Sequence, residues 1–233
     1  MVYRKAFYKK PICVLIVLLF LGISGLSARD TATFVDLGFS PDGRTFMFAQ
    51  YGVQAGTLKP WADLFIVDVP GNNFVGGGNI SYIHDRPVVF GQNGSGAFRS
   101  ILVRNASLIE RHRISHSSQG RPLFIALDNS ASNRIEFRDF DTGAFFRATL
   151  FQTTEGTGAA LRSSFFINVE REARDGTRRT YIVGTPNLKR PLIASYRIRQ
   201  ARIYGNSMIF VIEKERQEGA NISIRYMVEA LQL

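Results

Sequence analysis

Residues 34–49 read FVDLGFSPDGRTFMFA, in which the tetrad SPDG separates two apolar runs. Pro41 presets φ at the first central position of a turn, Asp42 accepts local backbone hydrogen bonds, and Gly43 tolerates a positive φ. Each apolar run has the length and composition of a short strand. The stretch therefore predicts a β-hairpin that closes at SPDG.

The rest of the chain repeats this alternation of apolar run and turn. We expect strands at 34–39, 45–49, 64–69, 122–127, 134–140, 144–152, 164–172, 179–185, 196–204, 208–213 and 222–228. The run at 64–69 is nearly continuous in apolar character, which is typical of a strand buried on both faces. In 196–204 the alternation slips near Gln200, which predicts a β-bulge.

Three segments depart from this pattern. Residues 52–62 are expected to form a loop that carries Trp61, the single tryptophan. Residues 71–96 are rich in Gly and Asn, so they are expected to be weakly structured, with one short strand at 87–90. From 97 to 114 apolar residues recur at helical spacing, which predicts one helix.

Many short strands and one helix near 97–114 predict a mostly β fold. Its sheets are expected to be antiparallel, in a sandwich-like or partial-propeller-like arrangement. Residues 29–233 are long enough to bury roughly 70% of the unfolded surface, so a single secreted β-rich domain is expected there.

Residues 1–28 have the order of a secretory signal. Four basic residues come first, an apolar run follows at 12–21, and small residues close the segment at Ser27 and Ala28. The apolar run is shorter than the roughly 20 residues that a spanning helix needs. We expect cleavage after Ser27 or Ala28, and an exported chain in the periplasm or at the cell surface.

Cysteine content and charge narrow the range of functions. Cys13, in the signal segment, is the only cysteine, so the exported part can form no disulfide and no thiolate metal site. The formal charge is +10, and four of the positive charges lie in the signal segment. A basic exported surface suits anionic lipid or acidic glycans, whereas export argues against a nucleic-acid partner.

Two pairs of acids stand at strand spacing, Glu170 with Glu172 and Glu213 with Glu215. A glycosidase needs two carboxylates across a cleft, whereas neighbours on one strand face near basic residues are expected to be solvated. An envelope hydrolase whose site is assembled from distant acidic residues remains an alternative. No catalytic residue is predicted from these pairs.

The histidine pair and the glycine loop each lack a residue that a zinc-protease or phosphate-loop motif requires. His112 and His116 are four residues apart, but Arg113 occupies the position that a zinc protease gives to its glutamate base. Gly91 and Gly96 have the outer spacing of a phosphate loop without the lysine that follows it. We therefore predict no metal and no cofactor.

Aromatic residues beside the Gly- and Asn-rich loops are the candidate binding residues. These are Tyr51, Trp61 and Tyr82, to which we add Asn93 of the 91–96 loop. We expect a non-catalytic binding or structural module. Its partner is unknown, with an envelope protein or a glycan as candidates, and membrane contact is expected only through an uncleaved signal segment.

Four segments stand in a specific order: DLGFSPDGR (36–44), FAQYGVQ (48–54), PWADLFIVDV (60–69) and IRYMVE (224–229). Together they resemble a bacterial family of predicted secreted proteins, a domain of unknown function, and in character its spirochaete members. The resemblance implies export to a periplasm and no known activity. Many relatives carry Asp-Gly where this chain has Ala55-Gly56, so a metal held by that acid in relatives would be lacking here.

Overall fold

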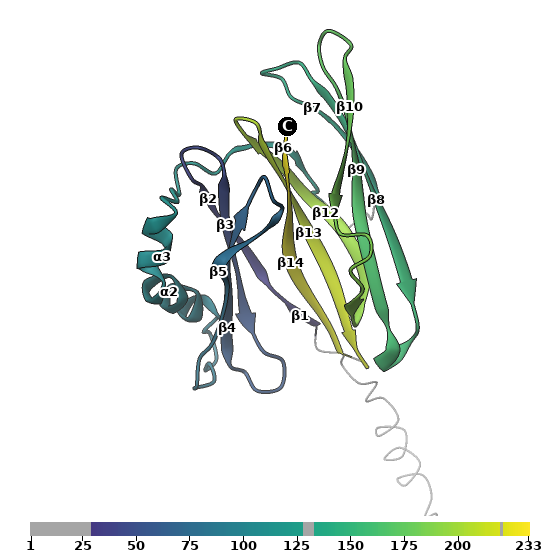
Figure 1. Ribbon diagram of the computed structural model, residues 1–233. Helices are drawn as coiled ribbons and strands as arrows, with labels where there is room; N and C mark the ends of the chain where they lie inside the picture. The colour runs from purple at the N-terminus through teal and green to yellow at the C-terminus, as the bar shows by residue number, and fades with distance from the viewer. Residues whose placement is uncertain (1–28, 128–132, 220) are drawn as a thin grey trace, which may run out of the picture.

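The computed structural model describes residues 29–127, 133–219 and 221–233 (Figure 1). The predicted signal segment, with Cys13, lies outside the described residues. Within them, strands dominate, and all pairings are antiparallel except that of β1 with β14. The predicted mostly β class with antiparallel sheets is confirmed.

Strands and helices follow one another with short connections. The strands are β1 (Arg29–Thr31), β2 (Thr33–Phe39), β3 (Thr45–Val53), β4 (Pro60–Asp68), β5 (Asn73–Ile83), β6 (Arg121–Ile125), β7 (Arg134–Arg138), β8 (Phe145–Glu155), β9 (Arg162–Glu172), β10 (Arg178–Gly184), β11 (Arg190–Pro191), β12 (Ile193–Tyr204), β13 (Ser207–Glu218) and β14 (Asn221–Gln232). The helices are α2 (Ser95–Arg104), α3 (Ala106–Arg111) and the short 3-10 helix η1 (Gly158–Ala160).

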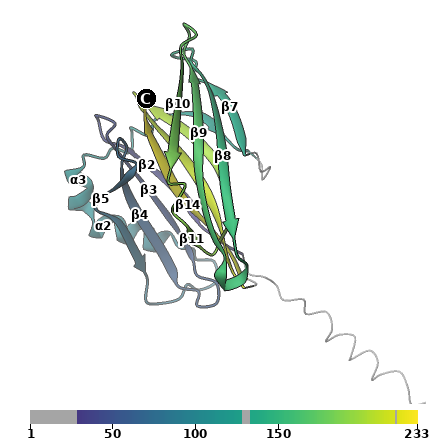
Figure 2. The same cartoon turned by 45° about the vertical axis from the view of Figure 1, so that its right-hand side comes forward.

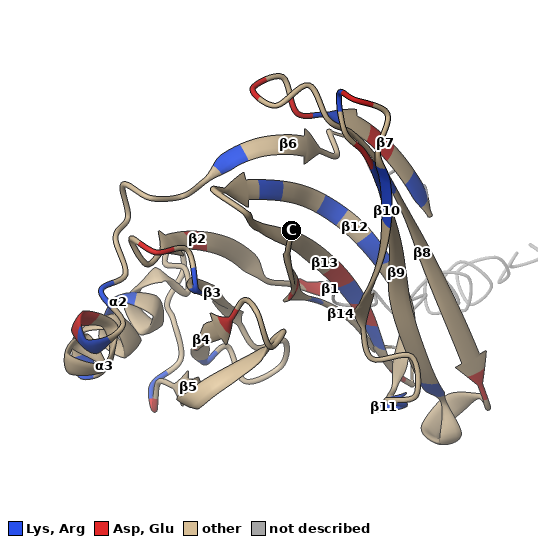
Figure 3. Ribbon diagram, turned by 45° about the horizontal axis from the view of Figure 1, so that its top comes forward, with Lys and Arg blue, Asp and Glu red and all other residues tan. Residues whose placement is uncertain are grey.

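The strands form three sheets that stack face to face. The central sheet has the order β1-β14-β13-β12-β6, the outer sheet has β10-β9-β8-β7 with β11 beside β9, and the helix-backed sheet has β2-β3-β4-β5. Figures 1 and 2 show the central sheet between the other two, with α2 and α3 beyond the helix-backed sheet. The arrangement is the sandwich-like alternative, extended by a third sheet, and the central sheet curls along its strands (Figure 3).

Strand β13 lies at the middle of this stack. Its residues Met208, Phe210 and Ile212 are buried in the core shared with the outer sheet. The alternate residues Ile209 and Val211 are buried in the core shared with the helix-backed sheet. Because successive side chains of a strand point to opposite faces, β13 contributes to both cores at once.

A third core lies between the helix-backed sheet and the helices. Leu64 and Ile66 of β4 pack there with Ala97 and Ile101 of α2. Val67 of the same strand faces the central sheet. The prediction that the 64–69 run is buried on both faces is therefore confirmed.

The hairpin predicted from SPDG is the pair β2–β3. The Ser40 backbone N–H donates to the Thr45 carbonyl at 2.9 Å, and Gly43 has φ 71°. The Asp42 carboxylate accepts hydrogen bonds from the Ser40 hydroxyl at 2.6 Å and from the Arg44 backbone N–H at 3.1 Å. The turn thus uses the residues on which the prediction rested.

The predicted bulge in the 196–204 strand is also present. The register of β12 against β13 shifts between Ile198 and Gln200. The shift lets Tyr196 and Ile198 share one core with Ala201 and Ile203 although their parity differs.

The expectations for 52–62 and 71–96 are correct only for the loops at 54–59 and 84–94. Trp61 belongs to β4, which begins at Pro60, since a proline is tolerated at the first residue of a strand. The glycine-rich segment forms β5, whereas 87–90 forms no strand. Hydrogen bonds to β4 hold β5 in place, and its register shifts opposite Phe65 and Val67, where the three glycines lie.

The helix predicted at 97–114 is present but divided. α2 and α3 are separated at Asn105, whose φ of −115° is not helical. The Asn105 side-chain amide donates to the Ile101 carbonyl at 2.7 Å, which satisfies an acceptor that the end of α2 leaves open.

We predict that Phe210→Ala lowers the free energy of unfolding by about 3–5 kcal/mol, because Phe210 is fully buried and its truncation opens a cavity in the core. Urea denaturation followed by far-ultraviolet circular dichroism measures it. Ile182→Ala, on the exposed face of β10, should change stability by less than about 1 kcal/mol. Equal effects of the two substitutions would contradict the central placement of β13.

Candidate functional site

Two of the predicted binding residues face the helices. Tyr51 of β3 stacks on Phe98 of α2, with ring centroids 5.4 Å apart. Tyr82 of β5 lies under Arg104, whose guanidinium carbon is 4.4 Å from the tyrosine ring centroid. Both tyrosines therefore fix α2 on the helix-backed sheet, and a binding role for them stays a prediction.

Trp61 lies on the opposite face of that sheet. Only 5% of it is exposed, and the Arg225 guanidinium carbon is 4.2 Å from its ring centroid. The Arg225 guanidinium also pairs with the Asp30 carboxylate at 2.5 Å. The expectation that Trp61 lies exposed on a loop is wrong, because the ring is covered where β4 meets β14.

Asn93 lies just before α2. Its side-chain oxygen accepts a hydrogen bond from the Ser95 backbone N–H at 3.0 Å. It lines an open depression of about 390 Å³ together with Pro60, His84 and Gln92. The four predicted residues thus do not gather on one surface.

A larger candidate surface lies on the outward face of the outer sheet, which we call the platform. Cross-strand partners of β8, β9 and β10 form its four rows: Phe145–Glu172–Arg178, Arg147–Glu170–Thr180, Thr149–Asn168–Ile182 and Phe151–Phe166–Gly184. The alternate residues of β8, such as Phe146 and Leu150, are buried in the core, so the rows face away from it. None of the described helices or strands covers this face (Figure 2).

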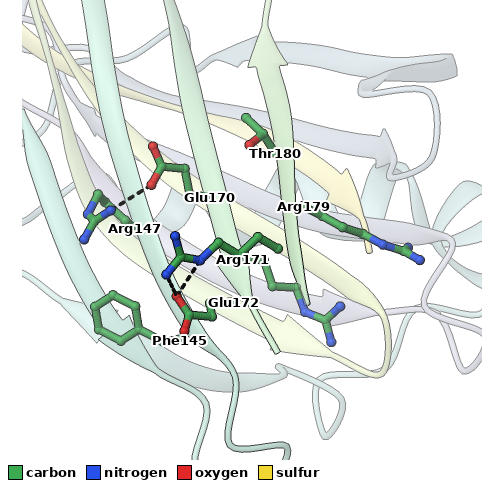
Figure 4. A pocket seen from close by; sticks show the side chains of 8 residues that line it. Phe145, Arg147, Glu170, Arg171, Glu172, Arg179 and Thr180 are labelled. Carbon is green, nitrogen blue, oxygen red and sulfur yellow. Dashed lines mark hydrogen bonds and ion pairs between the residues drawn. The ribbon is translucent and has the colours of Figure 1, made fainter. Parts of the chain in front are cut away.

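One end of the platform is charged. The Arg147 guanidinium donates to Glu170 at 2.8 Å (Figure 4). It also donates to Glu136 of β7 at 2.9 Å. The Arg178 guanidinium donates to Glu172 at 3.0 Å. Arg147, Glu170, Glu172 and Arg178 line a depression of about 450 Å³. Exposed pairs of this kind stabilise a fold little, but they hold donors and acceptors in a fixed array.

The other end of the platform is apolar. Phe151 and Phe166 stack with ring centroids 5.1 Å apart and an interplanar angle of 17°. Phe151 is 47% exposed, and Ile182 in the neighbouring row is 68% exposed. Exposed apolar groups gathered beside polar ones mark interaction surfaces on soluble proteins. Sequence reasoning missed this site because the two phenylalanines meet only through the pairing of β8 with β9.

The two predicted acid pairs have different environments. Glu170 and Glu172 are on the exposed platform, as expected for solvated acids. Glu213 is buried instead, and arginines of β12 surround it, with Arg197 at 3.3 Å and Arg199 at 3.6 Å. Figure 3 shows the arginine stripe of β12 beside the acids of β13. These carboxylates act as counter-ions to arginine, which does not favour proton transfer.

Two further acids with raised pKa values, the half-buried Asp36 and the buried Glu229, were not singled out from the sequence. Burial raises the pKa of Asp36 to about 6, and the Arg202 guanidinium, 2.9 Å away, opposes this rise. Burial also raises the pKa of Glu229, which accepts a hydrogen bond from the Asn72 side chain at 2.6 Å. Both lie inside apolar strand patterns, where the sequence carries no sign of their burial.

Neither a cluster of metal-ligating side chains nor a membrane-spanning helix is found among the described residues. Among residues 29–127, 133–219 and 221–233, no three metal-ligating side chains of His, Cys, Asp or Glu gather in one place. The backbone N–H of His112 donates to the Leu108 carbonyl at 3.2 Å where α3 ends. No helix in the described part of the chain has the length and apolar character needed to cross a membrane.

We predict that ionised Asp36 destabilises the fold. Because its pKa is about 6 in the folded state against 3.8 ordinarily, stability falls as pH rises from about 4 to about 6. The Asp36→Asn variant should gain stability relative to wild type across this window, by about 2–3 kcal/mol above pH 6, and match it near pH 4. Urea denaturation at several pH values measures the difference, and a pH-independent difference would contradict the prediction.

The comparisons with known proteins give a family. The family model described as "Predicted secreted protein (DUF2259)" matches residues 47–232. The chain therefore belongs to this family, whose description supports the prediction of export. No curated protein matches the chain.

Proposed function

We propose that this member of the predicted secreted protein family is a non-catalytic binding module that holds an envelope glycan on the platform of its outer sheet. The observation that carries the proposal is the stack of exposed Phe151 on half-buried Phe166, on a sheet face that no described element covers. The module would act in the periplasm or at the cell surface, and the likeness to spirochaete members favours the periplasm. Residues 29–233 would form its single domain.

The chemistry of the platform suits a sugar chain. Sugar rings present apolar C–H faces that pack on exposed aromatic rings, while their hydroxyls need donors and acceptors nearby. Thr149 and Asn168 supply such groups one row from the phenylalanines. Glu170 and Arg147 supply charged groups one row further.

The dimensions of the platform also fit an extended polymer. From Phe151 to Phe145 the strand advances six residues, which is about 20 Å. An extended glycan lying along β8 would contact the aromatic row at one end and the ion pairs at the other. The basic balance of the chain favours a glycan that carries acidic groups.

An envelope hydrolase assembled from distant acids has weaker support. Glu170, Glu172 and Glu213 each have an arginine partner. Asp36 and Glu229 have raised pKa values, but Asp36 lies beside Arg202 of β12 and Glu229 beside Asn72 and Arg190. These contacts support structural roles for the acids.

Phe151→Ala should weaken binding to insoluble peptidoglycan about ten-fold, because loss of one stacking ring removes roughly 1 to 1.5 kcal/mol. Co-sedimentation of the exported protein with peptidoglycan sacculi measures the dissociation constant. Phe90→Ala is the matched control, since Phe90 is an exposed phenylalanine on the side of the helix-backed sheet. Urea denaturation checks that both variants fold.

The proposal is wrong if Phe151→Ala and Phe90→Ala bind sacculi as wild type does. It is also wrong if the wild-type protein binds neither sacculi nor other insoluble polysaccharides. Hydrolysis of sacculi by the wild-type protein would instead favour the enzyme alternative.

A further inference from the structure

Two loops meet at one end of the helix-backed sheet, and we call them the rim: residues 54–59 and 84–92. The Val88 backbone N–H donates to the Leu58 carbonyl at 2.8 Å, and the His84 backbone N–H donates to the Pro60 carbonyl at 2.8 Å. The rim is therefore one hydrogen-bonded structure. It is independent of the platform, which lies on the far side of the central sheet (Figure 1).

The rim presents Phe90 at the tip of a closed turn. The Gln92 backbone N–H donates to the Val89 carbonyl at 3.0 Å, and the Gln92 side-chain oxygen accepts from the Val89 N–H at 3.2 Å. Gly91 has φ +84°, as the third residue of a type II turn requires. The turn thus holds a fully exposed phenylalanine ring, with the exposed side chain of Val89 beside it.

Leu58 is the exposed apolar residue of the other rim loop, 54–59. Its φ of 54° lies in the left-handed region, where a leucine is disfavoured relative to glycine or asparagine. Its side chain is nevertheless 53% exposed. A strained backbone that displays an apolar side chain to solvent is a reason to look for a function.

Cationic groups flank these apolar side chains. Lys59 and Arg86 form no ion pair within the described residues. One acid, Asp85, lies between His84 and Arg86 in the sequence. Apolar tips with basic neighbours match the interface of an anionic lipid bilayer, where the rings enter the headgroup region and the cations meet phosphates.

The position of the rim beside the start of the described chain also favours a bilayer as the partner. Asp30, two residues after the predicted signal segment, lines one depression with Gln54, Ala55 and Thr57. Figure 1 shows the described chain beginning at the end of the molecule that carries this loop. The first described residues, which directly follow the predicted signal segment, therefore lie beside the rim.

We propose that the rim docks on an anionic phospholipid surface, with Phe90, Val89 and Leu58 entering the interface. This differs from the expectation that membrane contact is limited to an uncleaved signal segment. It goes beyond glycan binding, which concerns the opposite side of the molecule.

The test places a tryptophan at the tip. The exported Phe90→Trp protein is mixed with phosphatidylglycerol vesicles that contain brominated acyl chains, and its emission is compared with that of wild type, in which Trp61 is buried. Phe140→Trp is the control, since Phe140 is another highly exposed phenylalanine, in the turn between β7 and β8. We expect a blue shift and quenching for Phe90→Trp alone. The protein used begins at Arg29, so a response of the reporter cannot come from residues 1–28.

Three variants then test the chemistry by vesicle co-sedimentation. Phe90→Ser should lower binding at least about ten-fold, and the Lys59→Gln, Arg86→Gln double variant should lower it on phosphatidylglycerol but not on phosphatidylcholine. Leu58→Asn should lower binding while raising the urea midpoint, so its effect cannot come from unfolding. Phe151→Ala should bind vesicles as wild type does, which separates this proposal from glycan binding.

The proposal is overturned if Phe90→Trp and Phe140→Trp respond alike, or if neither responds to vesicles. It is also overturned if the emission of Phe90→Trp shifts with soluble envelope proteins but not with vesicles, since the rim would then be a protein interface.

Discussion

The burial of β13 on both faces is the constraint on which the other layers depend. Ile209 and Val211 need the helix-backed sheet, and Met208, Phe210 and Ile212 need the outer sheet. Neither neighbour can be removed without exposing a row of apolar side chains, so the three sheets form a single stack. Each neighbouring sheet has a second face, which either packs against another element or stays exposed to solvent. Helices α2 and α3 cover that face of the helix-backed sheet, whereas the corresponding face of the outer sheet stays open.

This layered order places possible interactions at the periphery. The platform uses the one sheet face that no described element covers, and the rim uses loops that join the strands of the opposite sheet. The two surfaces lie on different sides of the central sheet, so binding at one leaves the other accessible (Figure 2). Under the two proposals, one chain would rest on a bilayer and hold a glycan at the same time. Both proposals require positions in the envelope, which agrees with the secreted character of the family.

The sequence predicted features whose determinants are local. The SPDG turn, the bulge near Gln200 and the doubly buried run of β4 each depend on residues close together in the chain, and each is confirmed. The sequence did not predict features that depend on distant partners. Pairing with β4 makes a strand of glycine-rich β5, and Arg225 from the other end of the chain covers Trp61. The platform follows the same rule, because Phe151 and Phe166 become neighbours only across two strands.

The central claim is that the open face of the outer sheet receives the ligand. Hydroxyl-radical footprinting of the exported protein, with and without saturating peptidoglycan sacculi, tests it residue by residue. The account predicts that oxidation of Phe151, Phe166 and Ile182 falls on binding while oxidation of Phe90 stays unchanged. Binding that leaves the oxidation of Phe151 and Phe166 as it is in the free protein would show that the ligand lies elsewhere and would contradict the account.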